Sequence, residues 1–213
     1  EPETNNKVYF ANYDMVQTEM TRVAKGSNYN PNLAGTASVF NAYFGSGLSS
    51  IVFQEIRESK SLAYSANASF RMPSDKNLND YMNVSIGTQA NKLPQAVDAI
   101  SVLLSDMPKI EKQFNNAKES SLKQIASSRI IKTSIFFNQL NLKKLGFDYD
   151  IRKDTYKKIQ NLTLEETNAF FNKEVKPKKY NTAIIGKKEN LDFEALKKLD
   201  EVEEVTLEEI FNY

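Results

Sequence analysis

The chain has 213 residues, of which 40% are hydrophobic and 26% charged, and its 28 basic and 27 acidic side chains leave a net charge of +1. This even balance argues against a nucleic-acid-binding protein, in which a basic face should dominate. Histidine and cysteine are both absent, which excludes disulfides, thiol nucleophiles, Ser-His-Asp triads and zinc sites built with these residues. We therefore expect no catalytic residue and no metal-ligand set here, and the chain alone is a poor candidate for a hydrolase.

The first two predicted elements are strands at residues 7–13 and 18–25, both rich in aromatic residues, Val and Thr. Too few residues separate them for a helical crossover, so the two strands should pair antiparallel. A helix should open at Asn30 and Pro31, because proline is tolerated in a first turn. Its expected buried positions, at helical spacing, are Leu33, Ala37, Phe40 and Phe44.

A turn with two glycines separates that helix from the next. Gly45 and Gly47 bracket Ser46, and we assign both glycines to a tight helix-to-helix turn. The string GSGLSS also invites comparison with a phosphate-binding loop, but such a loop needs a preceding strand, and the third glycine of the dinucleotide form is missing. The second helix should end near Ser59, and its expected buried positions are Leu48, Val52 and Ile56.

The next predicted unit is a hairpin. Residues 64–72 alternate apolar and polar side chains, residues 73–80 form a polar turn, and residues 82–88 alternate again. A strongly helical stretch with breaks then runs from Leu93 to Leu145, and Gly146 stands where a helix C-cap is expected.

The C-terminal third begins with TLEE at residues 163–166, which matches a capping box. A strand at residues 180–186 and a short helix near residues 193–199 should follow. This order predicts an α+β fold, a mostly antiparallel sheet with helices packed on one face. No repeat or linker divides residues 1–213, so a single domain is expected, and no apolar run of about 18 residues indicates a membrane span.

Arg57 and Tyr64 are the candidate functional side chains. By position alone, Arg57 is an exposed cation at a helix end and Tyr64 begins a strand, and neither composition nor periodicity rejects that interpretation. The surrounding string, YFGSGLSSIVFQEIRESKSLAYSANASF at residues 43–70, is more specific. It resembles the motif YFGGG-(M/L)-SS-x-(L/F)-F-x-x-(L/I)-RE-x-x-x-L-A-Y-S of the second, "inactive" type of domain in pitrilysin/insulysin-like zinc metallopeptidases. Ser46 is the one departure, at a position where glycine is usual.

The resemblance implies a partner role. In that family four similar α+β domains enclose the peptide, and one of them carries H-x-x-E-H, which holds zinc. A chain without histidine resembles the non-catalytic domain, so zinc is expected in a catalytic partner domain, within the same longer chain or in a partner chain. The resemblance further implies that Arg57, Tyr64 and Phe53 face a peptide substrate, with Gly45 and Gly47 as the structural turn that aims the helix.

Two functions stay open. The first is a non-catalytic, substrate-binding domain that holds the peptide and supports the transition state from the wall opposite the zinc. The alternative is a peptide-binding or scaffold subunit with no role in cleavage. No nucleic-acid partner is expected. The compartment is open as well, because the family occurs in the cytoplasm, in organelles and in the bacterial periplasm, and we favour the periplasm or cell envelope.

Overall fold

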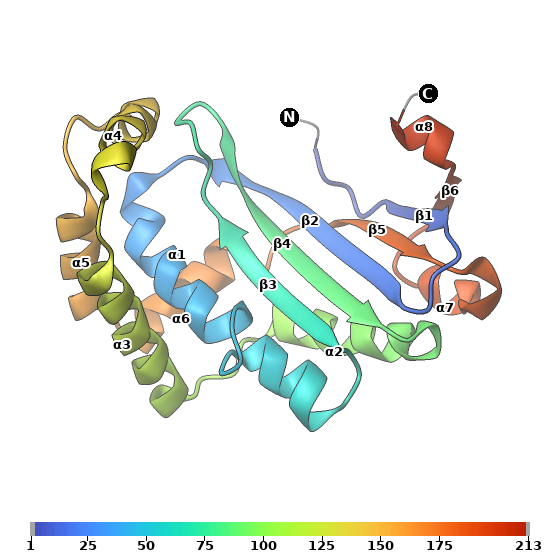
Figure 1. Cartoon of the computed structure of the whole chain (residues 1–213). Helices are drawn as coiled ribbons and strands as arrows, with labels where there is room; N and C mark the ends of the chain where they lie inside the picture. Colours follow the sequence, from blue (N-terminus) through green and yellow to red (C-terminus); the bar gives the residue numbers. More distant parts are fainter. Residues whose placement is uncertain (1–2, 212–213) are drawn as a thin grey trace.

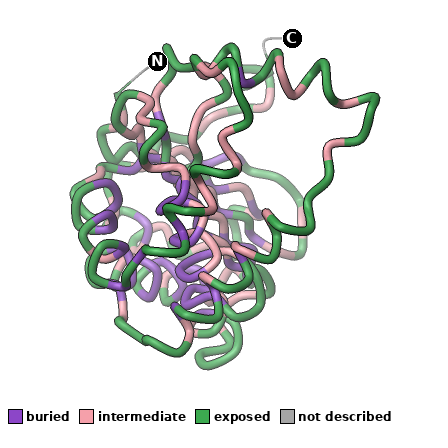
Figure 2. The backbone as a smooth tube through the Cα atoms, turned by 90° about the vertical axis from the view of Figure 1, so that its left-hand side faces the viewer, coloured by how far each residue is buried: buried purple, intermediate pink, exposed green. Residues whose placement is uncertain are grey.

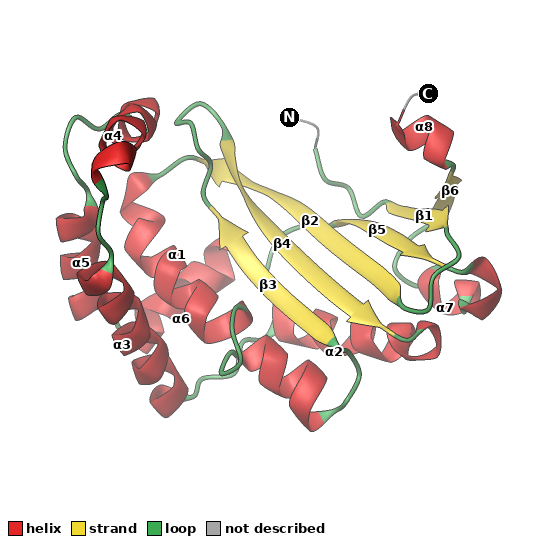
Figure 3. Ribbon diagram, in the orientation of Figure 1, coloured by secondary structure: helices red, strands yellow, loops and turns green. Residues whose placement is uncertain are grey.

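One six-stranded sheet organises the molecule (Figures 1 and 3). The computed structural model describes residues 3–211. The strands follow the order β3 (Ser65–Arg71), β4 (Asn79–Thr88), β2 (Thr18–Asn28), β5 (Asn181–Gly186), β1 (Val8–Asn12) and β6 (Val202–Val205). The first four strands in this order pair antiparallel, whereas β1 runs parallel to both β5 and β6. The predicted α+β class with a mostly antiparallel sheet is confirmed.

Strands β1 and β2 do not pair with each other, so the predicted pairing of the first two strands is wrong. β5 lies between them, and its Ile184 is opposite Phe10 of β1 on one side and Met20 of β2 on the other. Residues 13–17 are enough to step over β5, because adjacent strands lie only about 4.8 Å apart. The inserted strand brings three fully or almost fully buried apolar side chains into one row across the sheet, which favours this arrangement over a simple hairpin.

Helices form the connections and pack on one face of the sheet. Six α-helices of the described residues 3–211 have seven or more residues: α1 (Ala34–Phe40), α2 (Leu93–Ser105), α3 (Glu111–Ser127), α4 (Ile135–Lys144), α5 (Arg152–Asn161) and α6 (Leu164–Glu174). The other helical elements are η1 (Pro31–Leu33), η2 (Asn41–Gly45), η3 (Phe53–Ser59), η4 (Ala90–Lys92), η5 (Lys132–Ser134), η6 (Lys188–Asn190), α7 (Phe193–Leu196) and α8 (Leu207–Phe211). In Figure 3 the helices lie behind and beside the sheet, and none of those in residues 3–211 crosses the face turned to the viewer.

An aromatic cluster between the helices and the sheet forms the centre of the core. The ring of Phe40 stacks on Phe44 with 5.1 Å between centroids and lies 5.3 Å from Phe170 of α6. Phe170 in turn meets Phe70 of β3 edge-on at 5.0 Å. Figure 2 shows the buried segments gathered in the interior of the molecule, with exposed segments around them. The cluster ties α1, α6 and β3 together.

Most of the predicted buried positions in the two helices are buried: Ala37, Phe40, Phe44, Val52 and Ile56. Leu33 is only partly buried against the core. Leu48 is 70% exposed, so its predicted burial is wrong. The helical winding begins only at Ile51, and Leu48 lies in the preceding turn, where the amide and hydroxyl of Ser50 both donate to the carbonyl of Gly47. Leu48 is therefore outside the helical register that would turn it inward.

The local signals of the C-terminal half are confirmed. The amide of Glu166 donates to Thr163 Oγ1 at 3.1 Å, and the amide of Thr163 donates to Glu166 Oε2 at 3.0 Å, which completes the capping box. Gly146 adopts a φ of 89° directly after α4, and the amide of Phe147 donates to the carbonyl of Leu142 at 2.9 Å. Gly146 therefore ends α4 with the left-handed cap that glycine favours.

Candidate functional site

The two glycines of the turn between η2 and η3 are needed for different reasons. A Cβ on Gly45 would lie 1.7 Å from the carbonyl oxygen of Ala68 in β3, so no side chain fits there. Gly47 adopts a φ of 94°, in the left-handed region that glycine tolerates, and nothing lies within 4 Å of its Cβ position. Gly45 thus allows the turn to approach β3 closely, and Gly47 allows the chain to reverse.

The same turn covers the outer edge of β3. The side chain of Asn41 donates to the carbonyl of Phe70 at 2.9 Å and accepts from the Phe70 amide at 2.7 Å. The side-chain amide of Asn67 donates to Ser46 Oγ at 3.2 Å. Ser46 has a φ of −123°, which any residue adopts, so serine in place of the usual glycine introduces no backbone strain. These contacts hold η2 and the glycine turn against β3.

The following helix is wound more widely than an α-helix. Its η3 segment forms π-helical turns, which are rare and occur frequently at functional sites. The fully buried Ile56 holds the helix on the core. The chain then reverses where Ser61 adopts a φ of 49° and the amide of Leu62 donates to the carbonyl of Ile56 at 2.9 Å. The reversal returns the chain from Arg57 to Tyr64, the residue directly before β3.

Arg57 and Tyr64 line one cavity of about 340 Å³. The Arg57 side chain is 44% exposed and Tyr64 is 52% exposed. The structure therefore brings the two candidate residues together from different elements and leaves both accessible. The other lining residues come from η3 and the loop after it, and from the stretch between the end of β4 and the end of η4: Glu58, Ser61, Leu62, Ala63, Thr88, Gln89 and Lys92.

Hydrogen bonds fix the tyrosine side of the cavity. The amide of Tyr64 donates to the carbonyl of Gly87 at 2.9 Å, which continues the pairing of β3 with β4. The side chain of Gln89 donates to Tyr64 Oη at 2.9 Å, so the phenol oxygen acts as acceptor there and its own proton stays available. Lys92 Nζ donates to the carbonyl of Ser61 at 3.0 Å and adds a second cation to the cavity.

The Arg57 guanidinium lies over the ring of Phe53. The guanidinium carbon lies 4.8 Å from the centroid of the Phe53 ring, a cation–π distance. Arg57 Nε lies 3.8 Å from Glu58 Oε1, and the two side chains of this ion pair are 44% and 52% exposed, so the pair contributes little to stability. Phe53 is not among the residues that line the cavity in the described part of the chain, and its contact with the site is the one with the Arg57 guanidinium.

The sequence did not point to Gln89 and Lys92. They follow β4 in a short polar stretch without periodicity or motif. Only the register of the predicted hairpin could have identified them. Ser65 pairs with Gly87, and this pairing places the residues after Thr88 beside Tyr64. Sequence patterns establish that a hairpin exists more readily than they establish its register.

Within residues 3–211, no group of three or more His, Cys, Asp or Glu side chains is placed to hold a metal ion. No helix in the same range is long and apolar enough to cross a membrane. The side chains around the cavity offer two cations, one carboxylate and a phenol, a set suited to hydrogen bonding with a polar backbone.

Several solved structures share this fold. An M16 peptidase inactive domain from Pseudomonas fluorescens aligns with a TM-score of 0.68 and 18% identity, over 88% of this chain and 45% of that one. A protease from Helicobacter pylori aligns with a TM-score of 0.69 and 14% identity, over 87% and 45%. The periplasmic protease PqqL of Escherichia coli aligns with a TM-score of 0.65 and 14% identity, over 87% and 21%. The chain therefore spans less than half the length of each of these structures.

No curated protein sequence matches the chain. A family model does: the model described as the peptidase M16 inactive domain matches residues 1–124. This stretch is more than half of the 213 residues and contains the glycine turn, η3 and the hairpin that surrounds Tyr64. Sequence family and fold agree, and the chain belongs to the inactive-domain family of the M16 peptidases, the non-catalytic domain that the resemblance to pitrilysin/insulysin-like zinc metallopeptidases implied.

Proposed function

We propose that this domain holds a peptide substrate and supports its cleavage from the chamber wall opposite a zinc ion in a partner domain. One observation carries the proposal: Arg57 of η3 and Tyr64, directly before β3, line the same cavity and stay about half exposed. Buried polar side chains satisfy each other within a fold, whereas exposed donors that converge on a concave surface are available to a ligand.

Some hydrogen-bond donors of the Arg57 guanidinium have no acceptor in the described chain. Within residues 3–211 its contacts are the ring of Phe53 and the exposed carboxylate of Glu58, which faces Nε. The two terminal amino groups form no hydrogen bond in the described chain. A guanidinium is planar and always charged, so these two groups suit a carbonyl oxygen or a developing oxyanion.

The hydroxyl proton of Tyr64 has no acceptor in the described chain. Gln89 donates to Oη, which orients the phenol and leaves the O–H group free to donate elsewhere. A second, neutral donor beside the arginine would help to define the position of one substrate oxygen.

Both donors suit peptide hydrolysis. The zinc ion of the partner domain would supply an activated water and polarise the scissile carbonyl. Arg57 and Tyr64 would donate hydrogen bonds to the carbonyl oxygen as negative charge develops on it, and donors placed at such a charge lower the barrier. The partner we propose is an H-x-x-E-H domain in the same or a partner chain, and the periplasmic neighbour PqqL supports a periplasmic or cell-envelope location.

The test uses the complete peptidase, in which this domain is assembled with its H-x-x-E-H domain, and an internally quenched peptide as substrate. Arg57→Ala and Tyr64→Phe should each lower kcat by about 10²-fold, the typical loss for one oxyanion donor. KM and the unfolding midpoint should change little, because the missing bond matters most in the transition state. Arg71→Ala is the matched control, since Arg71 is an exposed arginine at the other end of β3 and should leave kcat unchanged.

Normal cleavage by the Arg57 and Tyr64 variants, accompanied by a lower melting temperature, would show that the pair is structural. Normal cleavage with unchanged stability and weaker peptide binding would instead favour the alternative, a peptide-binding or scaffold subunit without a role in cleavage.

A further inference from the structure

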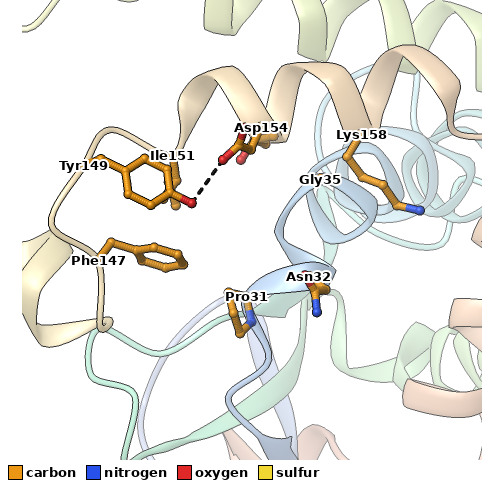
Figure 4. A pocket seen from close by; sticks show the side chains of 9 residues that line it. Pro31, Asn32, Gly35, Phe147, Tyr149, Ile151, Asp154 and Lys158 are labelled. Carbon is orange, nitrogen blue, oxygen red and sulfur yellow. Dashed lines mark hydrogen bonds between the residues drawn. The ribbon is translucent and has the colours of Figure 1, made fainter.

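A second cavity, of about 390 Å³, lies between the start of α1 and the start of α5 (Figure 4). It shares no lining residue with the cavity of Arg57 and Tyr64. Its walls come from η1 and α1 on one side and from α5 with the loop before it on the other: Pro31, Asn32, Gly35, Phe147, Tyr149, Ile151, Asp154, Thr155 and Lys158. Its volume is near the lower end of the range for ligand pockets, which suits a single side chain better than an extended ligand.

Two aromatic rings form one wall. Phe147 and Tyr149 meet edge to face with 5.7 Å between centroids, and in Figure 4 both rings project from the loop before α5 into the space between the helices. The left-handed cap at Gly146 and the bond from the Phe147 amide to Leu142 hold the base of this loop. Tyr149 is nevertheless 51% exposed, so a large aromatic surface is left open to solvent in a locally ordered segment.

A carboxylate stands beside the rings. Tyr149 donates its hydroxyl proton to Asp154 Oδ2 at 3.1 Å, and within the described chain Oδ1 of Asp154 has no hydrogen-bond partner. The hydrogen bond to Asp154 raises the pKa of the Tyr149 hydroxyl, and burial and the charges of Asp154 and Asp148 act in the same direction. This end of the cavity therefore carries a carboxylate with one oxygen available to a donor.

The one cation of the lining does not neutralise that end. Lys158 lies one helical turn after Asp154, and its ammonium forms an ion pair with Glu166 Oε1 at 3.4 Å. Figure 4 shows its side chain directed away from the two rings. The helices also approach closely here, because a Cβ on Gly35 would lie 3.1 Å from Cγ of Lys158. The cavity is thus a shaped space with aromatic faces and an available carboxylate oxygen.

We propose that this cavity binds an arginine side chain of a polypeptide partner. The guanidinium would stack on the face of one of the two perpendicular rings of Tyr149 and Phe147 and donate to Asp154 Oδ1. A guanidinium is weakly hydrated, stacks on aromatic faces and binds carboxylates through paired donors, so these walls suit it better than the compact, strongly hydrated ammonium of lysine.

The test is a titration of the full chain with N-acetyl-arginine amide, followed by backbone amide NMR shifts. Shifts should map to residues 147–155 and to the start of α1. The citrulline analogue, which has the same shape and no charge, should bind at least roughly 10-fold more weakly, because hydrogen bonds between charged groups contribute most to such a contact. The lysine analogue should fall between the two.

Variants separate the cavity from non-specific attraction to acidic surface. Asp154→Asn and Tyr149→Ala, both at exposed positions, should weaken arginine binding about 10-fold or more. Asp148→Asn is the matched control, because Asp148 is an exposed acid of the same loop outside the cavity lining, and it should leave binding nearly unchanged. Unfolding midpoints of all three variants check that the fold persists.

Equal binding of the arginine and citrulline compounds would overturn the proposal, as would equal losses in Asp148→Asn and Asp154→Asn. Shifts that map to the cavity of Arg57 and Tyr64 would also overturn it. Because none of these measurements involves cleavage, the outcome is independent of the proposed peptidase function.

Discussion

The segments before and after the glycine turn at Gly45 and Gly47 have opposite surroundings. Before the turn, Phe40 and Phe44 are fully buried and contact the rings of α6. After the turn, Arg57 rests on Phe53 and remains open to solvent. The segment before the turn is fixed in the core, and the contacts of the turn with β3 keep the segment after it at the surface. The comparison shows that one short stretch of sequence can contain both side chains that pack in the core and side chains that stay open to solvent.

The largest expected effect comes from a substitution at Gly45, where the turn contacts β3. Gly45→Ala places a methyl group where the carbonyl oxygen of Ala68 already lies, so the turn must leave the edge of β3. The free energy of unfolding should fall by about 4 kcal/mol or more, measured by urea denaturation. Gly47→Ala is the control, because that position has open space and only an unfavourable φ, for which about 1–2 kcal/mol is expected. Equal losses in the two variants would remove the distinction between the glycines.

The next effect compares the aromatic residues of the two segments. Phe40→Ala should lower the free energy of unfolding by roughly 3–5 kcal/mol, because it leaves a cavity in the aromatic cluster. Phe53→Ala, at a partly exposed position, should lower it by less than about 1 kcal/mol. Thermal unfolding of both variants provides the measurement. An undetectable change for Phe40→Ala would show that α1 packs through a different face.

A buried carboxyl group in the packed part of the molecule gives a pH-dependent effect. Asp80 at the start of β4 is fully buried, and neither of its carboxylate oxygens meets a hydrogen-bond donor among residues 3–211. Burial raises the pKa of Asp80 from 3.8 to about 6, helped by the charge of Glu174 and opposed by Lys178. The neighbouring Tyr29 also has a raised pKa, through its own burial and the charge of Asp80.

The sign of the pH effect follows from proton binding. Between pH 3.8 and about 6 the folded protein holds a proton on Asp80 that the unfolded chain has lost, so stability falls as the pH rises through this window. Asp80→Asn should therefore match the wild type near pH 3.5 and be more stable by about 1–3 kcal/mol at pH 7. Urea denaturation from pH 3.5 to 8 measures the difference. A constant difference across that range would show that Asp80 does not titrate in the window.

The smallest effect concerns the position where the chain departs from the family motif. Ser46→Gly removes the hydrogen bond that Ser46 Oγ accepts from Asn67 and should reduce the free energy of unfolding by roughly 0.5–1.5 kcal/mol. Ser46→Ala separates the lost bond from the added flexibility of glycine. A more stable glycine variant would show that the turn prefers glycine at all three positions.

Much of the fold was predictable because its signals are local. The Thr163–Glu166 capping box, the cap at Gly146 and the alternation along β3 and β4 each depend on residues a few positions apart. The helical spacing of the buried Phe40 and Phe44 is also a local signal. Of the candidate site, the sequence identified Arg57 and Tyr64 through the family motif, and their functional role stays a prediction.

What only the tertiary structure decided depends on contacts between distant parts of the chain. The placement of β5 between β1 and β2 joins Val8 to Thr182, and no local pattern encodes a pairing across that separation. Gln89 reaches Tyr64 through the register of a hairpin, and Leu48 is exposed because the turn before η3 delays the helix. Asp80 is buried although its residue type is mostly found on the surface, and this burial likewise depends on a distant segment, since Gly26 of β2 lies directly against it. Backbone periodicity determines which elements form, whereas the packing of their side chains determines which of them meet.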